Sequence, residues 1–251
     1  MFGHCTCEHI KSGSTLNQSR VDTPGHPLAA PRTTDNKIGG DLLIDVGSGP
    51  TLYQVLSGCE VFSKVLLTDF LEVNRQELKK WLKGEGGSLD WTPYIQYVCK
   101  LEGRSPSEWK EKAARLREVV SDVLPIDVHR AQPMASDALP SEGADCLVSC
   151  FCLESVSPDL DTFTKALGHI GTLLRSEGHL LLIGALQESY YFGGPGVKIP
   201  VVPLNEAQVC AALQDYYCTI TIPQCHWPLQ PPSTFTHSPY SYWAMWVKCL
   251  A

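Results

Sequence analysis

A short glycine turn and an acidic residue twenty positions after it are the first residues of this chain that could hold a ligand. Gly47-Ser48-Gly49 follows the apolar run Leu42–Val46, and Asp69 follows the apolar run Val65–Leu67. Glycines allow a tight turn and a close approach to a ligand, because no Cβ stands in the way. A carboxylate at the tip of the next strand can accept both hydroxyls of a ribose. Together these features predict a nucleotide-binding βαβ unit, with Pro50 at the start of its helix.

The spacing of the glycines favours one class of nucleotide. The dinucleotide fingerprint needs a third glycine three residues after the second, and Leu52 occupies that position. A leucine side chain would hinder the close packing of helix on strand around a pyrophosphate. A ligand with ribose and adenine but no phosphates fits better, and S-adenosylmethionine is the candidate cofactor. The alternatives are an ordinary strand-to-helix turn and a nucleotide-dependent oxidoreductase.

Three further acids stand where strands are expected to end. Asp127, Glu154 and Glu188 follow or end the apolar runs 123–128, 144–150 and 179–184. Ligands of open α/β sheets bind beyond the carboxyl ends of the strands. We therefore predict that these acids share one pocket with the glycine turn and Asp69.

The spacing of apolar residues along the chain predicts alternating helices and strands. Helices are expected at 71–82, 91–98, 159–174 and 205–213, the last with Asn205 as its N-cap. The strongly charged stretch 105–120 is expected to be a surface insertion with Ser107 as N-cap. Further strands are expected at 217–222 and 242–247, and a hairpin or lid at 190–202. The alternation predicts an α/β domain with a doubly wound, mostly parallel, seven-stranded sheet and helices on both faces.

Composition narrows the class of protein. The chain has 251 residues, 43% of them hydrophobic, and a net charge of −7. The lack of a long basic run weighs against nucleic acid or an anionic membrane as a partner. No apolar stretch reaches the ~18 residues of a membrane helix, and no secretory signal is visible. The 11 cysteines lack zinc-finger spacing, so we expect reduced thiols, no metal, and a monomeric cytoplasmic protein.

The first forty residues differ from the rest. Residues 1–40 are poor in apolar side chains and rich in Ser, Thr, Pro and Gly. Such a segment cannot bury enough apolar surface to offset the entropy lost on folding. We expect residues 1–40 to be disordered and residues 41–251 to form the ligand-binding domain.

Five segments, in order and at fitting spacing, resemble the small-molecule N-methyltransferases that act on phenylethanolamine, nicotinamide and indolethylamine. They read LLIDVGSGPTLYQ, TDFLEVNRQEL, LPIDVH, SCFCLESVSPDL and HLLLIGALQES, and they lie between residues 41 and 213. TDFLEVN and FCLE favour the phenylethanolamine branch. The resemblance implies a class I methyltransferase fold that uses S-adenosylmethionine to methylate the amine of a small arylalkylamine.

The resemblance also implies roles for individual residues. For the cofactor, it assigns the methionine part to Gly47, Ser48 and Gly49, the carboxylate to Thr51 and Tyr53, the ribose to Asp69, and the adenine side to Phe70, Asn74, Asp127 and Val128. On the substrate side, Phe151 would stack on the ring, while Glu154 and Glu188 would face the amine. A carboxylate there can attract the ammonium and accept its proton, which frees the lone pair for attack. Two carboxylates in one pocket would also raise each other's pKa.

Several of these residues also have a purely structural interpretation. Glu154 could be a first-turn acid stabilised by the helix dipole, Asp127 could cap a turn, and Phe151 could be a core aromatic. The chain also departs from the family at two places. Residues 1–40 do not match the family's tyrosine-bearing N-terminal lid, and 231–241 contains no Asp or Glu. The alternative function is therefore a catalytically impaired cofactor-binding or interaction variant.

Overall fold

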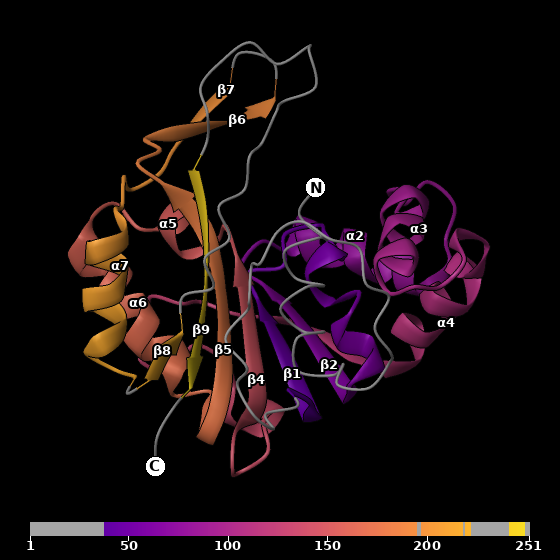
Figure 1. Cartoon of the computed structure of the whole chain (residues 1–251), viewed down its shortest axis with the longest axis horizontal. Coiled ribbons are helices and arrows are strands. Elements are labelled where there is room, and N and C mark those ends of the chain that lie inside the picture. Colours follow the sequence, from indigo (N-terminus) through magenta and orange to yellow (C-terminus); the bar gives the residue numbers. More distant parts are fainter. Residues whose placement is uncertain (1–37, 195–196, 218, 222–240, 249–251) are drawn as a thin grey trace, which may run out of the picture.

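Buried strands from successive parts of the chain form one sheet. The computed structural model describes residues 38–194, 197–217, 219–221 and 241–248 (Figure 1). The sheet order is β3-β2-β1-β4-β5-β9-β8. Its strands are β1 (Gly40–Val46), β2 (Phe62–Asp69), β3 (Val120–Pro125), β4 (Ala144–Cys150), β5 (Leu174–Leu186), β8 (Thr219–Thr221) and β9 (Ser241–Lys248). The first five are parallel, whereas β9 is antiparallel to β5 and β8. The predicted doubly wound, mostly parallel sheet is confirmed.

The strand order reverses beside β1. This strand pairs with β2 on one side and with β4 on the other, so the chain builds outward to β3 before it crosses back to β4. The loops that follow β1 and β4 therefore separate in opposite directions. Such a reversal opens a crevice at the carboxyl ends of the strands, where ligands of this architecture bind.

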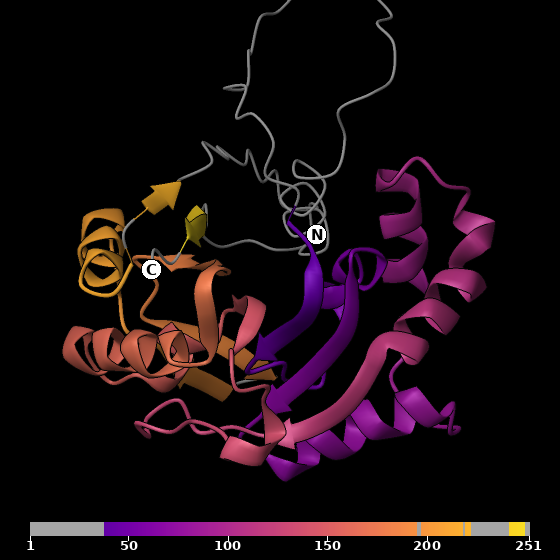
Figure 2. The same cartoon turned by 90° about the horizontal axis from the view of Figure 1, so that it is seen from below.

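Alternate residues of β1 enter two separate hydrophobic cores, because successive side chains of a strand point to opposite faces. Leu43 belongs to the core that includes α2 (Glu72–Lys83), α3 (Thr92–Leu101) and α4 (Trp109–Val119). Ile44 belongs to the other core, with α6 (Leu160–Gly171) and α7 (Glu206–Gln214). Figure 2 shows the magenta helices α3 and α4 and the orange helices of the second group on opposite sides of the molecule. The prediction of helices on both faces is confirmed.

The helix predicted to begin at Pro50 does not form. Only two short 3-10 helices, η1 (Tyr53–Val55) and η2 (Gly58–Glu60), connect β1 to β2. The carbonyl of Ser48 accepts hydrogen bonds from the Thr51 hydroxyl at 2.7 Å and from Gln54 Nε2 at 2.9 Å. The Thr51 backbone N–H donates to the same carbonyl at 3.3 Å, which closes a turn after the glycines. Two side-chain donors thus reinforce this turn, and it stands in place of the predicted helix.

The charged stretch 105–120 was wrongly predicted to be a surface insertion. Its helix α4 buries Ala113, Leu116 and Val119 in the same core as Leu43, because apolar residues three apart form one face between the charges. The predicted N-cap at Ser107 is also wrong. Ser105 caps the preceding turn η3 (Pro106–Glu108) in a capping box with Glu108.

Two strand boundaries also differ from the prediction. β3 begins at Val120 and ends at Pro125, so that Asp127 lies in the loop beyond it. β5 begins at Leu174, where the sequence predicted the end of a helix. Its register against β4 shifts between Ala144 and Cys146, and Glu177 has a φ of 60°. A bulge therefore absorbs the residues that the sequence indicated as a helix terminus.

Other predicted elements are confirmed. Asn205 caps α7 in a capping box with Gln208. The stretch 190–202 contains the antiparallel hairpin of β6 (Tyr190–Gly194) and β7 (Val197–Pro200), which projects beyond the sheet at the top of Figure 1. The expectations for 1–37 and for 231–240 lie outside the described residues. Within the described ranges, no helix combines the length and apolar character needed to cross a membrane.

A buried lysine joins the connection between β1 and β2 to the helices that cover it. Lys112 of α4 is fully buried, and its Nζ lies 2.9 Å from Glu60 Oε1 and 2.8 Å from Glu102 Oε2. The other Glu102 oxygen accepts from Ser57 Oγ at 2.8 Å. Removing one member of such a group leaves an uncompensated buried charge.

We therefore expect Lys112→Met to lower the free energy of unfolding by about 3–5 kcal/mol, because Glu102 would remain buried without its cation. Urea unfolding followed by circular dichroism measures the change. The control is Lys110→Met, since Lys110 is exposed on the same helix. Equal stability of the two variants would contradict a stabilising role for the buried ion group.

Candidate functional site at the carboxyl ends of the parallel strands

The glycine turn after β1 depends on both of its glycines. Gly47 and Gly49 have φ angles of 71° and 59°, a conformation that side chains disfavour. A Cβ on Gly47 would also lie 2.1 Å from Cys152 Sγ. The turn is tied to β2, because Ser48 N donates to the Thr68 carbonyl at 2.7 Å and Ser48 Oγ accepts from Thr68 N. The result is a cradle of backbone at which the Cys152 side chain takes the space that a Cβ on Gly47 would need.

Asp69 joins this cradle to the helix α2. Its Oδ2 accepts from Gly49 N at 2.8 Å, and its Oδ1 accepts from Leu71 N at 2.8 Å and from Asn74 Nδ2 at 3.0 Å. Arg75 holds the backbone at the same place by donating to the Asp69 and Phe70 carbonyls. A carboxylate offers about four acceptor positions, so Asp69 retains capacity for a ligand hydroxyl.

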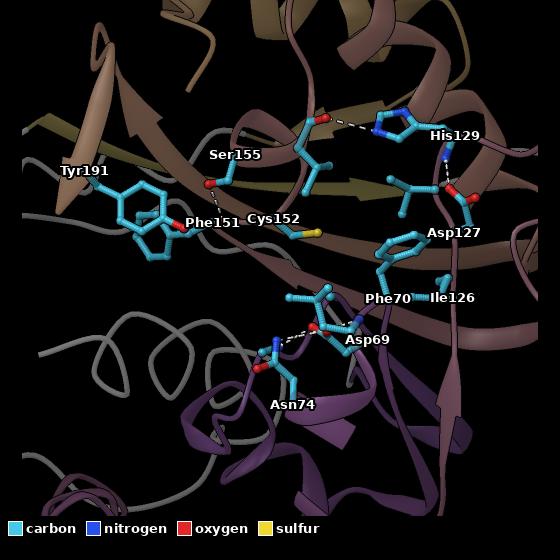
Figure 3. Close-up of a pocket in the computed structure, with 15 residues that line it drawn as sticks. Asp69, Phe70, Asn74, Ile126, Asp127, His129, Phe151, Cys152, Ser155 and Tyr191 are labelled. Carbon is cyan, nitrogen blue, oxygen red and sulfur yellow. Dashed lines mark hydrogen bonds between the residues drawn. The ribbon is translucent and has the colours of Figure 1, made fainter. Parts of the chain in front are cut away.

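A cleft of about 590 Å³ lies directly above these residues. Eight of the predicted site residues line it, namely Gly47, Gly49, Asp69, Phe70, Asn74, Asp127, Val128 and Phe151. Figure 3 shows Phe151 and Tyr191 at one end of the cleft and Phe70 and Asp127 at the other. These residues lie at or just beyond the carboxyl ends of four different parallel strands, and the structure brings them together at the reversal of strand order beside β1.

The other predicted site residues are not among those that line the cleft. Thr51 donates its hydroxyl to the Ser48 carbonyl, and Tyr53 packs on Trp91 with 6.5 Å between ring centroids. Ser48 and Glu154 are buried, and Glu188 is half-buried. Their predicted roles toward a ligand remain predictions.

Glu154 occupies the first turn of α5 (Leu153–Val156) beneath one end of the cleft. Only 3% of it is exposed, and its Oε1 accepts from Ala185 N at 3.2 Å. Burial raises the pKa of Glu154 to about 7, although the bonds from backbone N–H groups oppose this. Burial also raises the pKa of Glu188. The expected mutual effect of the two carboxylates is therefore wrong, because desolvation of each is the dominant cause.

Phe151 and Asp127 are both held by local backbone contacts. Phe151 has a φ of 55°, which is rare for a large side chain, and its carbonyl accepts from Ser155 Oγ at 2.8 Å. Phe151 lines the cleft with part of its surface exposed and is thus not an ordinary core aromatic. Asp127 Oδ1 accepts from His129 N at 3.1 Å, so this carboxylate does cap a turn, while it also lines the cleft.

The sequence reasoning missed several residues at this site. Tyr191, His129 and Cys152 line the cleft, and His129 Nε2 lies 3.0 Å from the Val156 carbonyl. The hairpin predicted at 190–202 was the available signal for Tyr191.

Asp45 is the most notable residue that the sequence analysis did not single out. It is fully buried in β1, and neither carboxylate oxygen has a hydrogen-bond partner among the described residues. An acid between Ile44 and Val46 in a buried strand was the signal for it.

The chemistry of the cleft is that of an acidic site without a metal cluster. The described part of the chain contains no group of three or more His, Cys, Asp or Glu side chains placed to hold a metal ion. Cys59, Cys99, Cys146 and Cys150 are free and buried in the core, as expected of packing thiols. The site therefore consists of a backbone cradle, the Asp69 carboxylate that accepts from it, and two buried acids whose pKa burial has raised, namely Asp45 and Glu154.

The parallel sheet, its strand order and the cleft beyond the strand ends define an α/β protein with a class I methyltransferase fold. A solved S-adenosylmethionine-dependent methyltransferase from Methanosarcina mazei shares the fold with a TM-score of 0.53. The sequences are 11% identical, and the match covers 84% of this chain and 94% of that one. The chain belongs to the NNMT/PNMT/TEMT family, whose model matches residues 27–230.

Relatives with names include phenylethanolamine and nicotinamide N-methyltransferases. Phenylethanolamine N-methyltransferase from Bos taurus is 55% identical over 177 residues, which cover 70% of this chain and 62% of the bovine protein. The Homo sapiens protein of the same name is 52% identical, with 62% of its length covered. Nicotinamide N-methyltransferase from Homo sapiens is 45% identical over 183 residues, which cover 73% of this chain and 68% of that protein. The chain thus spans about three fifths of the length of the phenylethanolamine relatives that it matches.

The buried Asp45 makes stability depend on pH in a predictable direction. Burial raises its pKa to about 8 in the folded protein, from the ordinary 3.8 expected in the unfolded chain. The stability that this proton provides is complete below pH 4 and is lost as the pH rises to 8, by roughly 1.4 kcal/mol per pH unit. Asparagine has no proton to lose. Asp45→Asn should therefore become more stable relative to the wild type between pH 5 and pH 8 in thermal unfolding. Parallel pH profiles of the two proteins would contradict a neutral, buried Asp45.

Proposed function

We propose that this chain binds S-adenosylmethionine in the cleft and transfers its methyl group to the amine of a small arylalkylamine of the phenylethanolamine type. The observation that carries the proposal is the Asp69 carboxylate, which is bonded to the glycine cradle and lines the cleft at the strand-order reversal. This is the position of a ribose-binding acid. Family membership and the names of the most similar relatives support methyl transfer to an amine nitrogen.

The missing helix after the glycine turn argues against a phosphate-bearing nucleotide. Pyrophosphate sites use the free N–H groups and the dipole at a helix N-terminus. Here the residues after Gly49 form the short turns η1 and η2. Within the described part of the chain, no α-helix thus follows the cradle directly, which disfavours the alternative of a nucleotide-dependent oxidoreductase and favours a cofactor without phosphates.

The residues at the cleft fit such a cofactor. Gly47 and Gly49 would lie against its methionine part, with Ser48, Thr51 and Tyr53 of the same segment beside it. Asp69 would accept the ribose hydroxyls. The adenine would lie between the side of Phe70 and Asn74 and the loop of Asp127 and Val128. When bound, the cofactor supplies a methyl group activated by its positive sulfur.

The substrate side needs a ring platform and a proton acceptor. Phe151 would stack on the aromatic ring of the amine, with Tyr191 of the hairpin at the same end of the cleft. An alkylamine is mostly protonated at pH 7 and must lose a proton before its nitrogen can attack. Glu154 adjoins the cleft-lining residues Cys152 and Ser155, and a pKa of about 7 suits exchange of a proton at neutral pH. Glu188 would add a second negative charge that attracts the ammonium.

The remaining parts of the proposal concern the whole chain. Residues 41–251 would form the methyltransferase domain. A net charge of −7 supports a small cationic substrate over nucleic acid, because a polyanion would be repelled. We further propose a monomeric, cytoplasmic enzyme.

The second candidate function is that of a variant that binds the cofactor but transfers its methyl group slowly. The lack of Asp or Glu in 231–241 is the observation that favours it. Incubation with methyl-labelled S-adenosylmethionine and a panel of arylalkylamines decides between them.

We expect Asp69→Ala to lower the affinity for S-adenosylmethionine by at least tenfold. The substitution removes charge-assisted hydrogen bonds to the ribose, each worth about 1.5–3 kcal/mol, and releases the Gly49 N–H that fixes the cradle. Isothermal titration calorimetry measures the loss. Asp122→Ala on the neighbouring strand β3 is the control, because this exposed acid lies away from the cleft. Unchanged affinity in folded Asp69→Ala protein would refute the cofactor assignment.

We expect Glu154→Gln to reduce methylation of any accepted amine by ~10²-fold or more, the usual effect of a lost acid–base group, with cofactor affinity unchanged. The control is Glu206→Gln. Glu206 is likewise a first-turn acid, but it lies exposed on α7 outside the cleft. If Glu154 acted only on the helix dipole, the two variants would behave alike. Parallel loss of cofactor binding would equally contradict a role on the substrate side.

A further inference from the structure

Two histidine side chains join the loop after β3 to segments that follow β4. His169 Nδ1 of α6 lies 2.9 Å from the Val128 carbonyl, and His129 Nε2 lies 3.0 Å from the Val156 carbonyl at the end of α5. Figure 3 shows the second of these bonds beside the cleft. A carbonyl oxygen only accepts hydrogen bonds, so each of these ring nitrogens carries the proton that it donates.

The loop between β3 and η4 (Ser136–Ala138) depends on such bonds for its shape. Residues 126–135 form neither helix nor strand, so no ladder of backbone bonds holds them. Apolar packing places Val128 in the same core as Ile44. The backbone bond from the loop to β2, between Ile126 N and the Asp69 carbonyl, is long at 3.4 Å. The two imidazoles therefore supply shorter bonds, and these hold the loop against the other half of the sheet.

The segments that carry the other ends of these bonds are themselves firmly held. α6 buries Leu167 and Ile170 completely on either side of His169. α5 is joined to the end of the hairpin segment, because the Glu154 carbonyl accepts from Val202 N at 3.0 Å. The two histidine bonds thus fix the loop relative to parts of the molecule that are set by the core.

The two bonds differ in what their loss would expose. Val128 is only 6% exposed, so without His169 its carbonyl would be buried and lack a donor, which a protein structure avoids by moving the backbone. Val156 is 45% exposed, and water can replace His129 at its carbonyl. Asp127 and Val128 both line the cleft. A shift of the loop would therefore move a wall of the cleft, and His169 should matter more than His129.

We propose that His169 and His129 are positioning residues, which hold this loop at the distance at which the cleft distinguishes adenine from hypoxanthine. This inference rests on the proposed function, in which Asp127 lies beside the base. An ionised carboxylate only accepts hydrogen bonds. The 6-amino group of adenine can donate to it, whereas the 6-oxo group of hypoxanthine cannot and leaves the site without its bond. Such discrimination needs an acceptor at a fixed place.

The test compares two ligands that differ only in the base, S-adenosylhomocysteine and S-inosylhomocysteine, by isothermal titration calorimetry. We expect the wild type to bind the adenine ligand at least about tenfold more tightly, because the hypoxanthine ligand loses a hydrogen bond to a charged group. His169→Leu should bind S-adenosylhomocysteine about tenfold more weakly and lose most of this preference. His129→Leu should show the same changes to a smaller extent, about threefold.

Amide side chains provide matched controls for the two donors. His169→Asn places an N–H close to the position of Nδ1, and His129→Gln places one close to the position of Nε2. Both variants should therefore bind S-adenosylhomocysteine nearly as the wild type does and keep the preference for adenine. His129→Asn carries the same amide on a shorter side chain and should behave like His129→Leu. Lost stability alone would not alter the ratio of the two affinities in folded protein, and thermal unfolding verifies that each variant is folded.

The outcomes separate this inference from the proposed function. If S-adenosylhomocysteine does not bind the wild type, the proposed function fails and this inference with it. If it binds but the wild type shows no preference for adenine, or if His169→Leu keeps both affinity and preference, only the role of the histidines is overturned. An equal loss in His169→Asn and His169→Leu would overturn it as well, because the donor would then be irrelevant. Should His169→Leu fail to fold, an unchanged preference in His129→Leu would decide against the proposal.

Discussion

The hydrogen bonds of the Asp69 carboxylate are the constraint on which the rest of the site depends. One oxygen holds Gly49 of the cradle, and the other holds the start of α2 through Leu71 N and Asn74. The end of β1, the end of β2 and the first turn of α2 are thereby fixed to one another. A charged acceptor in a nearly buried place makes such bonds strong, and the same carboxylate faces the cleft. The Asp69 side chain therefore both holds these three segments together and lines the cleft.

The electrostatics of the cleft follow from the clustering of acids at the carboxyl ends of the strands. Asp45, Asp69 and Glu154 lie around the cradle, and burial raises the pKa of the first and the last. The buried lysine of the domain, Lys112, is committed to Glu60 and Glu102 in the opposite helical layer. A site with this balance of charge is suited to a ligand that brings positive charge with it. S-adenosylmethionine carries a sulfonium and an ammonium, and a protonated amine substrate carries a third cation.

The segment between β1 and β2 shows how side chains can redirect a backbone. The Thr51 and Gln54 side chains both donate to the Ser48 carbonyl, which also accepts from the Thr51 backbone N–H, and these bonds hold a turn. The chain makes two short 3-10 helices instead, and no α-helix follows the cradle directly. This local outcome changes the class of ligand that the site favours, although the glycine spacing resembles that of dinucleotide sites.

The sequence by itself determined the doubly wound sheet, the capping of α7 by Asn205, and the gathering of the glycine turn, Asp69 and Asp127 at one edge. These features follow from local periodicity and from the rule that parallel strands share their carboxyl ends. Only the tertiary structure decided that the charged α4 packs into the core and that no helix follows Pro50. It also decided that Asp45 is fully buried, with no hydrogen-bond partner for its carboxylate oxygens among the described residues. Burial and hydrogen-bond partners are set by segments far apart in the chain, such as the loop of Cys152 against Gly47, and these contacts leave no local pattern in the sequence.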